Sequence, residues 1–416
     1  MTLSGILQTL LNKGVDISHP HAVDIGTEVS PDRISGKGVT LYPGTKIYGA
    51  ETVISSGVKL GYEGPVTLED CQLGKNCELK AGFFRSSVFL DGSSMGSGAH
   101  VREGCLLEEE ANAGHTVGLK QTVLFPFVTL GSLINFCDCL MAGGTDRKNH
   151  SEVGSSYVHF NYTPQQDKAT ASLIGDVPRG VMLRQRPIFL GGQGGLVGPS
   201  RIGYGTVIAA GAVFRGDCPE GGKLISGPDT KTSENKDFHP GLYGDITRRV
   251  VNNVIYLANL LALKQWYVHV RRPFMTGDVH GEALYRGSLQ ILDMTAAERL
   301  KRLDDLADKM DGSTAQAARH LKGQSKTRII EAQRAFEKRW LGMRQAFAMD
   351  PEDYPGVYER QRFLDGFGRA AGRNSQYLPT VKALPPETTA TGECWLQQIV
   401  DGITNRAMAI LRAEAK

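Results

Sequence analysis

Residues 188–216, IFLGGQGGLVGPSRIGYGTVIAAGAVFRG, decide the fold. Large apolar residues recur there at every sixth position, and Gly or Ala follows three of them: Leu190, Leu196, Ile202, Ile208 and Phe214. Neither the 3.6-residue period of a helix nor the two-residue period of a strand explains this spacing. A six-residue repeat of an aliphatic residue followed by a small one is the signature of a parallel β-helix. Three hexads close one coil, so that one coil takes about 18 residues.

The hexad pattern and the glycine content divide the chain. Hexads begin near residue 36, and 36 of the 50 glycines precede residue 228, where the hexads stop. Tight turns use residues that tolerate positive φ, whereas long helices do not favour glycine. We therefore predict four parts: an N-terminal lead-in (1–35), a β-helix (36–227), a linker or cap (228–242) and a helical C-terminal region (243–416).

Sequence patterns also place helices and loops within these parts. Residues 245–270 predict a long helix that ends before Pro273, and residues 295–310 predict another that Thr295 caps. Further helices are expected within 313–349 and 393–415. Two polar segments interrupt the hexads, and we expect them to loop out from a corner of the coil, where repeat proteins carry specificity: residues 142–152 and 176–186.

Composition narrows the partners and the compartment. A net charge of +3 over 416 residues gives no reason to expect nucleic acid or an anionic membrane as a partner. Seven cysteines, an odd number, favour reduced thiols over a disulfide framework. The N-terminus lacks a secretory pattern, and the most apolar run, residues 254–263, is too short to span a bilayer. We expect a cytoplasmic protein. His19 and His21 are too few ligands for a metal site, so no metal is expected.

Two pairs of residues suggest a site for a small molecule. Arg102 and Lys120 lie one coil apart, so they would stack at one corner and favour a phosphate or carboxylate between them. The alternative is a pair of solvated surface cations. Asn161 and Tyr162 follow a hexad, and an amide beside a phenol suits sugar recognition. The alternative is a turn asparagine beside a packed tyrosine.

Three histidines are candidate general bases at neutral pH: His115, His150 and His159. His159 lies in a predicted strand and could face outward. His150 lies in the first of the two loops, beside a cluster of charged residues. Each of the three also has an ordinary structural interpretation.

The segment 102–216 resembles the acetyltransferase domain of the bacterial bifunctional UDP-N-acetylglucosamine pyrophosphorylase and glucosamine-1-phosphate N-acetyltransferase family. The match is best in VGSSYVHFNY, SLIGD and LVGPSRIGYGTVIAAGAV. This resemblance implies a left-handed parallel β-helix that forms a homotrimer. It also implies transfer of an acyl group from acetyl-CoA, or another acyl-CoA, to a phosphorylated or nucleotide-linked sugar.

The resemblance assigns roles to individual residues. Arg102 and Lys120 match the residues that hold the sugar phosphate, and Asn161 and Tyr162 match a pair at the sugar and acetyl-CoA site. Three positions match the coenzyme groove, although the family has Ser where this chain has Gly192: Ser155, Gly192 and Ala210.

The chain also departs from the family pattern. The family's catalytic histidine, twelve residues beyond Lys120, is Ser132 here, its nearby tyrosine is Asn135, and Thr163-Pro164 replaces an Asp-Gly. Loss of a positioned general base costs roughly 10²–10⁴-fold, and His159 or His150 would have to replace it.

Two functions remain open. One is a sugar acyltransferase. The other is a non-catalytic β-helix that binds sugar nucleotides or serves as an oligomeric scaffold. The family's nucleotidyltransferase domain is not recognisable, so no pyrophosphorylase activity is expected.

Overall fold

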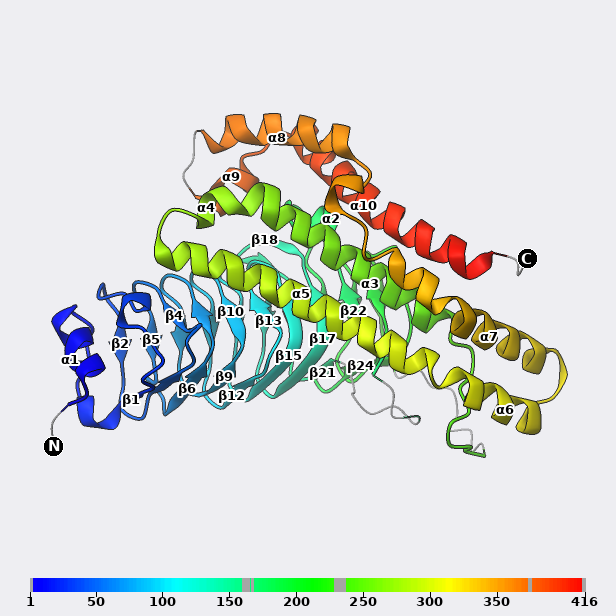
Figure 1. The fold of residues 1–416 in the computed structure, drawn as a ribbon, viewed down its shortest axis with the longest axis horizontal. Helices are drawn as coiled ribbons and strands as arrows, with labels where there is room; N and C mark the ends of the chain where they lie inside the picture. Colours follow the sequence, from blue (N-terminus) through cyan, green and yellow to red (C-terminus); the bar gives the residue numbers. More distant parts are fainter. Residues whose placement is uncertain (1–2, 159–164, 166–167, 228–236, 373–375, 414–416) are drawn as a thin grey trace.

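The computed structural model describes residues 3–158, 165, 168–227, 237–372 and 376–413. A parallel β-solenoid makes about 11 turns over residues 24–225, and a layer of helices lies along one side of it (Figure 1). The predicted fold, a parallel β-helix followed by a helical C-terminal region, is confirmed. The first paired strand, β1, lies within the range that the sequence assigned to a lead-in.

The solenoid has three faces, which we name A, B and C in the order in which the chain visits them. Face A consists of β2 (Thr40–Leu41), β5 (Lys59–Leu60), β8 (Glu78–Leu79), β11 (Ser94–Met95), β14 (Asn112–Ala113), β16 (Thr129–Leu130), β20 (Glu152–Val153), β23 (Phe189–Leu190), β26 (Val207–Ile208) and β28 (Leu224–Ile225). Face B consists of β1 (Asp24–Ile25), β3 (Lys46–Tyr48), β6 (Val66–Glu69), β9 (Gly82–Arg85), β12 (Ala99–Val101), β21 (Tyr157–Val158), β24 (Gly195–Leu196) and β27 (Val213–Phe214). Face C consists of β4 (Val53–Ile54), β7 (Gln72–Leu73), β10 (Ser87–Phe89), β13 (Cys105–Leu107), β22 (Ser172–Ile174) and β25 (Arg201–Ile202).

Two longer strands turn the corner between faces B and C. They are β15 (Val117–Leu124) and β17 (Ile134–Met141), and their first halves pair on face B and their second halves on face C. An antiparallel hairpin, β18 (Gly144–Asp146) and β19 (Asn149–His150), projects from the coil within the first predicted loop. The second predicted loop contains a short helix, α2 (Val177–Gly180).

The aliphatic hexad positions form the core, as predicted. On face A, for example, Leu41, Leu60 and Leu79 stack in register and are fully buried. All seven cysteines are free, and only Cys394 is exposed. Burial raises the pKa of the Cys71 and Cys77 thiols to about 12, so both stay protonated at neutral pH. The solenoid cysteines therefore act as small apolar core residues.

Helices follow the solenoid and precede it. The first helix is α1 (Gly5–Asn12), within the predicted lead-in. After the solenoid come α3 (Thr247–Trp266), a π-helical turn (Tyr267–Arg271), α4 (Arg272–Met275), α5 (Val279–Ala307), α6 (Met310–His320), α7 (Gly323–Gln345), α8 (Val357–Ala371), α9 (Tyr377–Lys382) and α10 (Pro386–Arg412). In the described ranges, none of these helices is both long enough and apolar enough to cross a membrane.

Two helix boundaries differ from the sequence prediction. The helix expected to end before Pro273 continues through the π-helical turn, and Pro273 lies in the first turn of α4, where its missing N–H is tolerated. Thr295 does not cap a helix. It is buried within α5, which begins at Val279. The Asp278 side chain caps this helix by accepting from the backbone N–H groups of His280 and Gly281.

The helical region covers face C. Outward-facing side chains on that face are apolar and fully buried: Val88, Leu106, Val123 and Leu140. Helix α5 crosses the first strands of face C and α3 crosses β22 (Figure 1). Helix α5 comes closest at Gly287, where an added Cβ would lie 2.4 Å from Gln72 Oε1 and 3.1 Å from Val88 Cγ2. Burial of this apolar face holds the helices on the solenoid.

Buried charges also join the helices to the solenoid. Arg299 Nη2 donates to Asp138 Oδ1 at 2.7 Å, and both side chains are buried. The guanidinium of Arg271 makes a two-point contact with Glu109, at 2.6 and 3.1 Å. Because such pairs cost a large desolvation penalty when one partner is lost, they fix the position of the helices.

Candidate functional site

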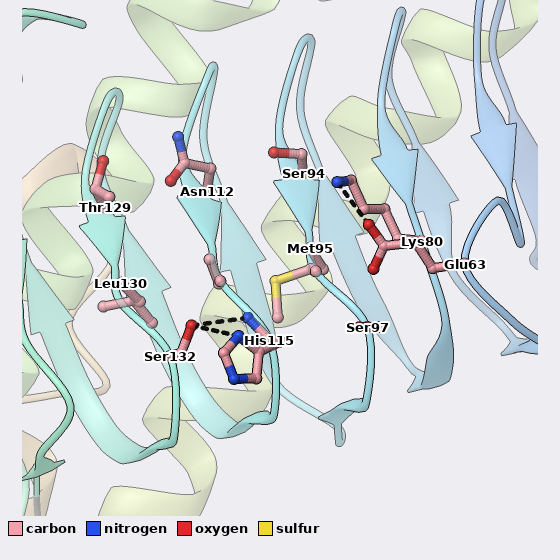
Figure 2. Close-up of a pocket in the computed structure, with 13 residues that line it drawn as sticks. Glu63, Lys80, Ser94, Met95, Ser97, Asn112, His115, Thr129, Leu130 and Ser132 are labelled. Carbon is pink, nitrogen blue, oxygen red and sulfur yellow. Dashed lines mark hydrogen bonds and ion pairs between the residues drawn. The ribbon is translucent and has the colours of Figure 1, made fainter.

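A groove of about 520 Å³ lies on face A and on the corner between faces A and B, which we call corner AB (Figure 2). Its floor carries the outward-facing side chains of three successive strands, Ser94, Asn112 and Thr129. Glycines form the turn at corner AB. At Gly114 an added Cβ would lie 2.5 Å from Ser132 Oγ and 3.1 Å from the backbone of Gly131, so a side chain there would displace the Ser132 hydroxyl.

One row of residues runs along corner AB, one from each coil. Strand register places each member two residues after a core residue of face A: Ser97, His115, Ser132, Ser155, Gly192 and Ala210. Backbone hydrogen bonds hold the row together, as from Leu133 N to the His115 carbonyl at 3.0 Å and from Gln193 N to the Ser155 carbonyl at 2.7 Å. The three residues predicted to line the coenzyme groove thus lie in one row with His115 and Ser132.

His115 and Ser132 make direct contact in this row. His115 Nδ1 lies 2.7 Å from Ser132 Oγ, and the backbone N–H of His115 donates to the same oxygen at 3.2 Å (Figure 2). His115 is exposed and both residues line the groove. Ser132, which the resemblance aligns with a histidine, therefore contacts a histidine from the preceding coil.

An ion pair borders the other end of the groove. Lys80 Nζ lies 2.9 Å from Glu63 Oε1 (Figure 2). Hydrogen bonds from Lys80 and Ser97 hold the pKa of the Glu63 carboxyl below its usual value, so it is ionised at neutral pH. The groove is therefore polar along its length, with an imidazole at one position and a paired carboxylate at another.

The hairpin β18–β19 reaches the groove through Arg147. Its guanidinium donates to the carbonyl oxygens of Glu110 and Phe127, at 2.9 and 3.0 Å, and to Thr129 Oγ1 at 3.3 Å. Thr129 lines the groove. The predicted loop 142–152 thus borders the groove at Thr129.

Arg102 and Lys120 lie at a different corner, between faces B and C. Register places them side by side on adjacent coils, as predicted. Lys120 Nζ lies 2.6 Å from Glu103 Oε1. Burial alone would raise the pKa of Glu103, but the hydrogen bond from Lys120 and the charges of Lys120 and Arg102 outweigh it and leave the pKa below its usual value. Neither cation lines the groove on corner AB.

Of the two histidines predicted to act as the base in the resembled reaction, only His150 lies among the described residues. His159 lies outside the described residues, as do Asn161 and Tyr162. His150 lies in β19 on the projecting hairpin and does not line the groove. In the part of the chain with described coordinates, no three His, Cys, Asp or Glu side chains gather in a way that could hold a metal ion.

The His115–Ser132 contact was missed at the sequence level. The two residues are 17 positions apart, one fewer than the expected coil of about 18, so counting 18 back from Ser132 does not lead to His115. Aligning core positions instead, Ala113 with Leu130, would have placed His115 opposite Ser132.

The fold and the corner row define a hexapeptide-repeat β-helix protein with a polar corner groove. The chain is similar to curated proteins called bifunctional protein GlmU. It is 28% identical to that of Pelobacter propionicus over 224 residues, which is 53% of this chain and 43% of the relative. It is 28% identical to that of Thermotoga maritima over 214 residues (51% and 42%), and 29% identical to that of Clavibacter sepedonicus over 215 residues (51% and 38%). The resemblance predicted from the motifs is confirmed.

The similarity is partial in both directions. The chain spans less than half the length of these relatives. No protein-family model matches it. Among solved structures, LpxA from Acinetobacter baumannii shares 13% identity and covers 67% of this chain and 90% of its own, with a TM-score of 0.17, too low to support an argument.

Proposed function

We propose that the protein transfers an acyl group from acyl-CoA, most simply acetyl-CoA, to a phosphorylated or nucleotide-linked sugar. The observation that carries this proposal is the His115–Ser132 contact in the groove of corner AB. The similarity to GlmU supports the reaction class.

His115 is the proposed general base, in place of His159 or His150. Ser132 Oγ already accepts from the backbone N–H of His115. If Nδ1–H donates to the same oxygen, the neutral ring leaves Nε2 free to accept a proton. Nε2 takes the proton of the acceptor's amine or hydroxyl as that group attacks the thioester carbonyl. The C–S bond then breaks and coenzyme A leaves as the thiol or thiolate.

The rest of the corner row suits the acyl-CoA. Beyond Ser132 the row continues through Ser155, Gly192 and Ala210, whose small side chains leave the backbone accessible. An added Cβ at Gly192 would meet nothing nearer than 3.5 Å, so the surface there is open. A long, flexible donor could lie along this row with its thioester near His115.

A homotrimer is the proposed assembly. Arg102 and Lys120 flank the edge of face B opposite to His115, so one chain does not bring them into one groove. In a trimer, a second copy could place its corner between faces B and C, with Arg102 and Lys120, against corner AB of the first copy. Face A also carries three exposed apolar side chains in register, Phe189, Val207 and Leu224, which a neighbouring copy could cover.

The test is release of free coenzyme A from acetyl-CoA in the presence of glucosamine 1-phosphate and a panel of other aminosugars and nucleotide sugars. Acceptor-dependent release that His115→Ala abolishes supports the proposal. Binding of acceptors with no turnover across the panel would favour the second candidate, a non-catalytic sugar-binding β-helix. That candidate is favoured by the Lys120–Glu103 ion pair, which neutralises one of the two cations expected to hold phosphate.

A further inference from the structure

A second, larger cavity lies where the solenoid meets the helical region. Its volume is about 930 Å³, and it shares no lining residue with the groove of corner AB. One wall is corner CA, the turns between faces C and A. The other wall is the segment from α4 to the start of α5, together with α9 (Figure 1). Because the helical region supplies more than half of the lining residues, the cavity depends on the helices as well as on the solenoid.

Corner CA presents a row of charged and polar residues to the cavity: Lys37, Ser56, Lys75, Asp91 and Glu109. Their order follows from backbone hydrogen bonds between adjacent coils, from Gly57 N to the Lys37 carbonyl, from Asn76 N to that of Ser56, and from Gly92 N to that of Lys75. Adjacent coils are about 4.8 Å apart, so the two lysines are separated by about 10 Å with Ser56 between them. The row is cationic at one end and acidic at the other.

The two lysines are available to an anion. Lys37 and Lys75 are both exposed, and neither ammonium group forms an ion pair with a carboxylate in the described ranges. Two of the acids that line the cavity accept hydrogen bonds from other groups. Asp91 Oδ1 accepts from the backbone N–H of Lys75 at 2.7 Å, and Glu109 binds Arg271.

A buried hydroxyl next to Ser56 in the same coil has no partner. Ser55 lines the cavity and is 3% exposed, yet its Oγ makes no hydrogen bond to any residue that the structure describes. An unpaired buried hydroxyl costs free energy, which a ligand oxygen would offset. Helix α5 begins at the opposite wall, where the Asp278 carboxylate already accepts from the backbone N–H groups of His280 and Gly281.

The remaining walls suit a sugar ring. Phe274, Leu284 and Tyr377 give the helical side an apolar surface. Tyr377 is held rigidly, because Arg271 stacks 4.0 Å from its ring centre and its hydroxyl accepts from Trp266 Nε1 at 2.8 Å. At the acidic end, Asp91 and Glu110 supply carboxylate oxygens, which accept hydrogen bonds from hydroxyl groups.

We propose that this cavity binds a phosphorylated sugar, with the phosphate between Lys37 and Lys75 and the hydroxyl-bearing ring between the aromatic wall and the carboxylates of Asp91 and Glu110. The same chemistry is present in a free sugar phosphate and in the ribose phosphate of a nucleotide. The site is separate from the proposed acyl-transfer groove and does not depend on that activity.

Isothermal titration calorimetry on the full-length protein tests this. The probes are glucose 1-phosphate, UMP, inorganic phosphate and glucose. We expect glucose 1-phosphate or UMP to bind, inorganic phosphate to bind more weakly, and neutral glucose not to bind. Whichever of glucose 1-phosphate and UMP binds more tightly shows whether the ligand is a free sugar phosphate or a nucleotide. The Lys37→Ala/Lys75→Ala variant should weaken binding at least tenfold and reduce its dependence on salt.

Two controls make the outcome decisive. Lys46→Ala removes an exposed lysine of face B that does not line the cavity, and it should bind like the unmodified protein. Arg102→Ala/Lys120→Ala removes the cations predicted to hold phosphate elsewhere, and it should retain the binding as well. The proposal is overturned if neither phosphorylated probe binds at millimolar concentration, if the Lys37/Lys75 variant binds normally, or if only the Arg102/Lys120 variant loses binding.

Discussion

The side chains of His115 and Ser132 meet across two adjacent coils of the solenoid, with Nδ1 and Oγ 2.7 Å apart. In the chain order of the family pattern, Ser132 occupies the position of a catalytic histidine. An imidazole is present at the same corner one coil earlier, and it lies opposite the serine because each of the two residues follows a paired core residue of face A, Ala113 or Leu130, by two positions. Successive coils of a repeat protein present equivalent positions, so a residue of one coil can lie where the pattern places the same residue type in the next.

His115→Ala should lower acceptor-dependent coenzyme A release by roughly 10²–10⁴-fold, the usual cost of removing a general base. Steady-state rates at saturating acceptor measure this. His100→Ala is the matched control, because His100 is also exposed on the solenoid, where it stacks on Phe83, but does not line the groove. Equal losses in both variants would indicate a general effect on the fold and contradict the assignment.

Co-expression of two differently tagged variants tests whether the site lies between copies of the chain. One chain carries Arg102→Ala/Lys120→Ala and the other His115→Ala, and each alone should be inactive. If a site takes its cations from one chain and its histidine from the next, random mixing in a trimer restores about one quarter of the sites. Purified mixed assemblies that remain inactive would argue for a site within one chain.

Gly287→Ala should destabilise the protein by about 1–3 kcal/mol, because the new Cβ would overlap Gln72 and press on Val88 at the closest approach of α5 to face C. Gly312→Ala in α6 is the control. Nothing lies within 4 Å of its Cβ position, so the higher helix propensity of alanine should stabilise by up to about 1 kcal/mol. Urea unfolding curves give both values. Similar effects of the two substitutions would mean that α5 does not pack on face C in this way.

The fold was predictable from the sequence because the six-residue period reflects the core directly. Leu190, Leu196 and Ile202 lie on faces A, B and C in turn, six residues apart, and all three are buried in the core. The covering of face C was not predicted, although its signal was present: paired apolar residues, as in Val88-Phe89, mark a strand that is buried on both sides.

The candidate site was less predictable because coil length varies. Ser151 and Ile188 lie on adjacent coils but are 37 residues apart, and the segment between them includes the inserted helix α2. Residues brought together across such insertions cannot be found by counting hexads. The cavity beside Lys37 and Lys75 depends on helices more than 150 residues away, for which the sequence offers no register at all.

Asp138→Ala should destabilise the protein by about 3–5 kcal/mol, because it leaves the buried Arg299 guanidinium without its closest carboxylate. Glu298, at 3.8 Å, is too distant to replace it fully. The control is Glu282→Ala, which breaks the exposed Glu282–Arg286 pair and should cost about 1 kcal/mol or less. Chemical denaturation of both variants compares them, and equal stability losses would contradict a structural role for the buried pair.

Glu108 gives the protein a specific dependence of stability on pH. Burial beneath the helices raises the pKa of its carboxyl to about 7, against the opposing charge of Arg271 and the hydrogen bond that Tyr267 Oη donates at 2.5 Å. The folded state therefore holds a proton that the unfolded chain has released above about pH 4.3. Between about pH 4.3 and about pH 7 the folded state binds more protons than the unfolded chain, so stability falls as the pH rises through this interval. Above about pH 7 the stability levels off.

Glu108→Gln should remove this dependence, since the amide keeps an acceptor for Tyr267 and carries no charge. Between pH 4.5 and pH 8, the free energy of unfolding of the variant should rise relative to that of the unmodified protein by an amount on the order of 3 kcal/mol. Urea unfolding at several pH values measures the difference, with the exposed Glu282→Gln as a control that should follow the unmodified protein. Parallel curves for Glu108→Gln and the unmodified protein across this range would show that Glu108 is ionised in the folded state, and that the seam between helices and solenoid tolerates a buried negative charge.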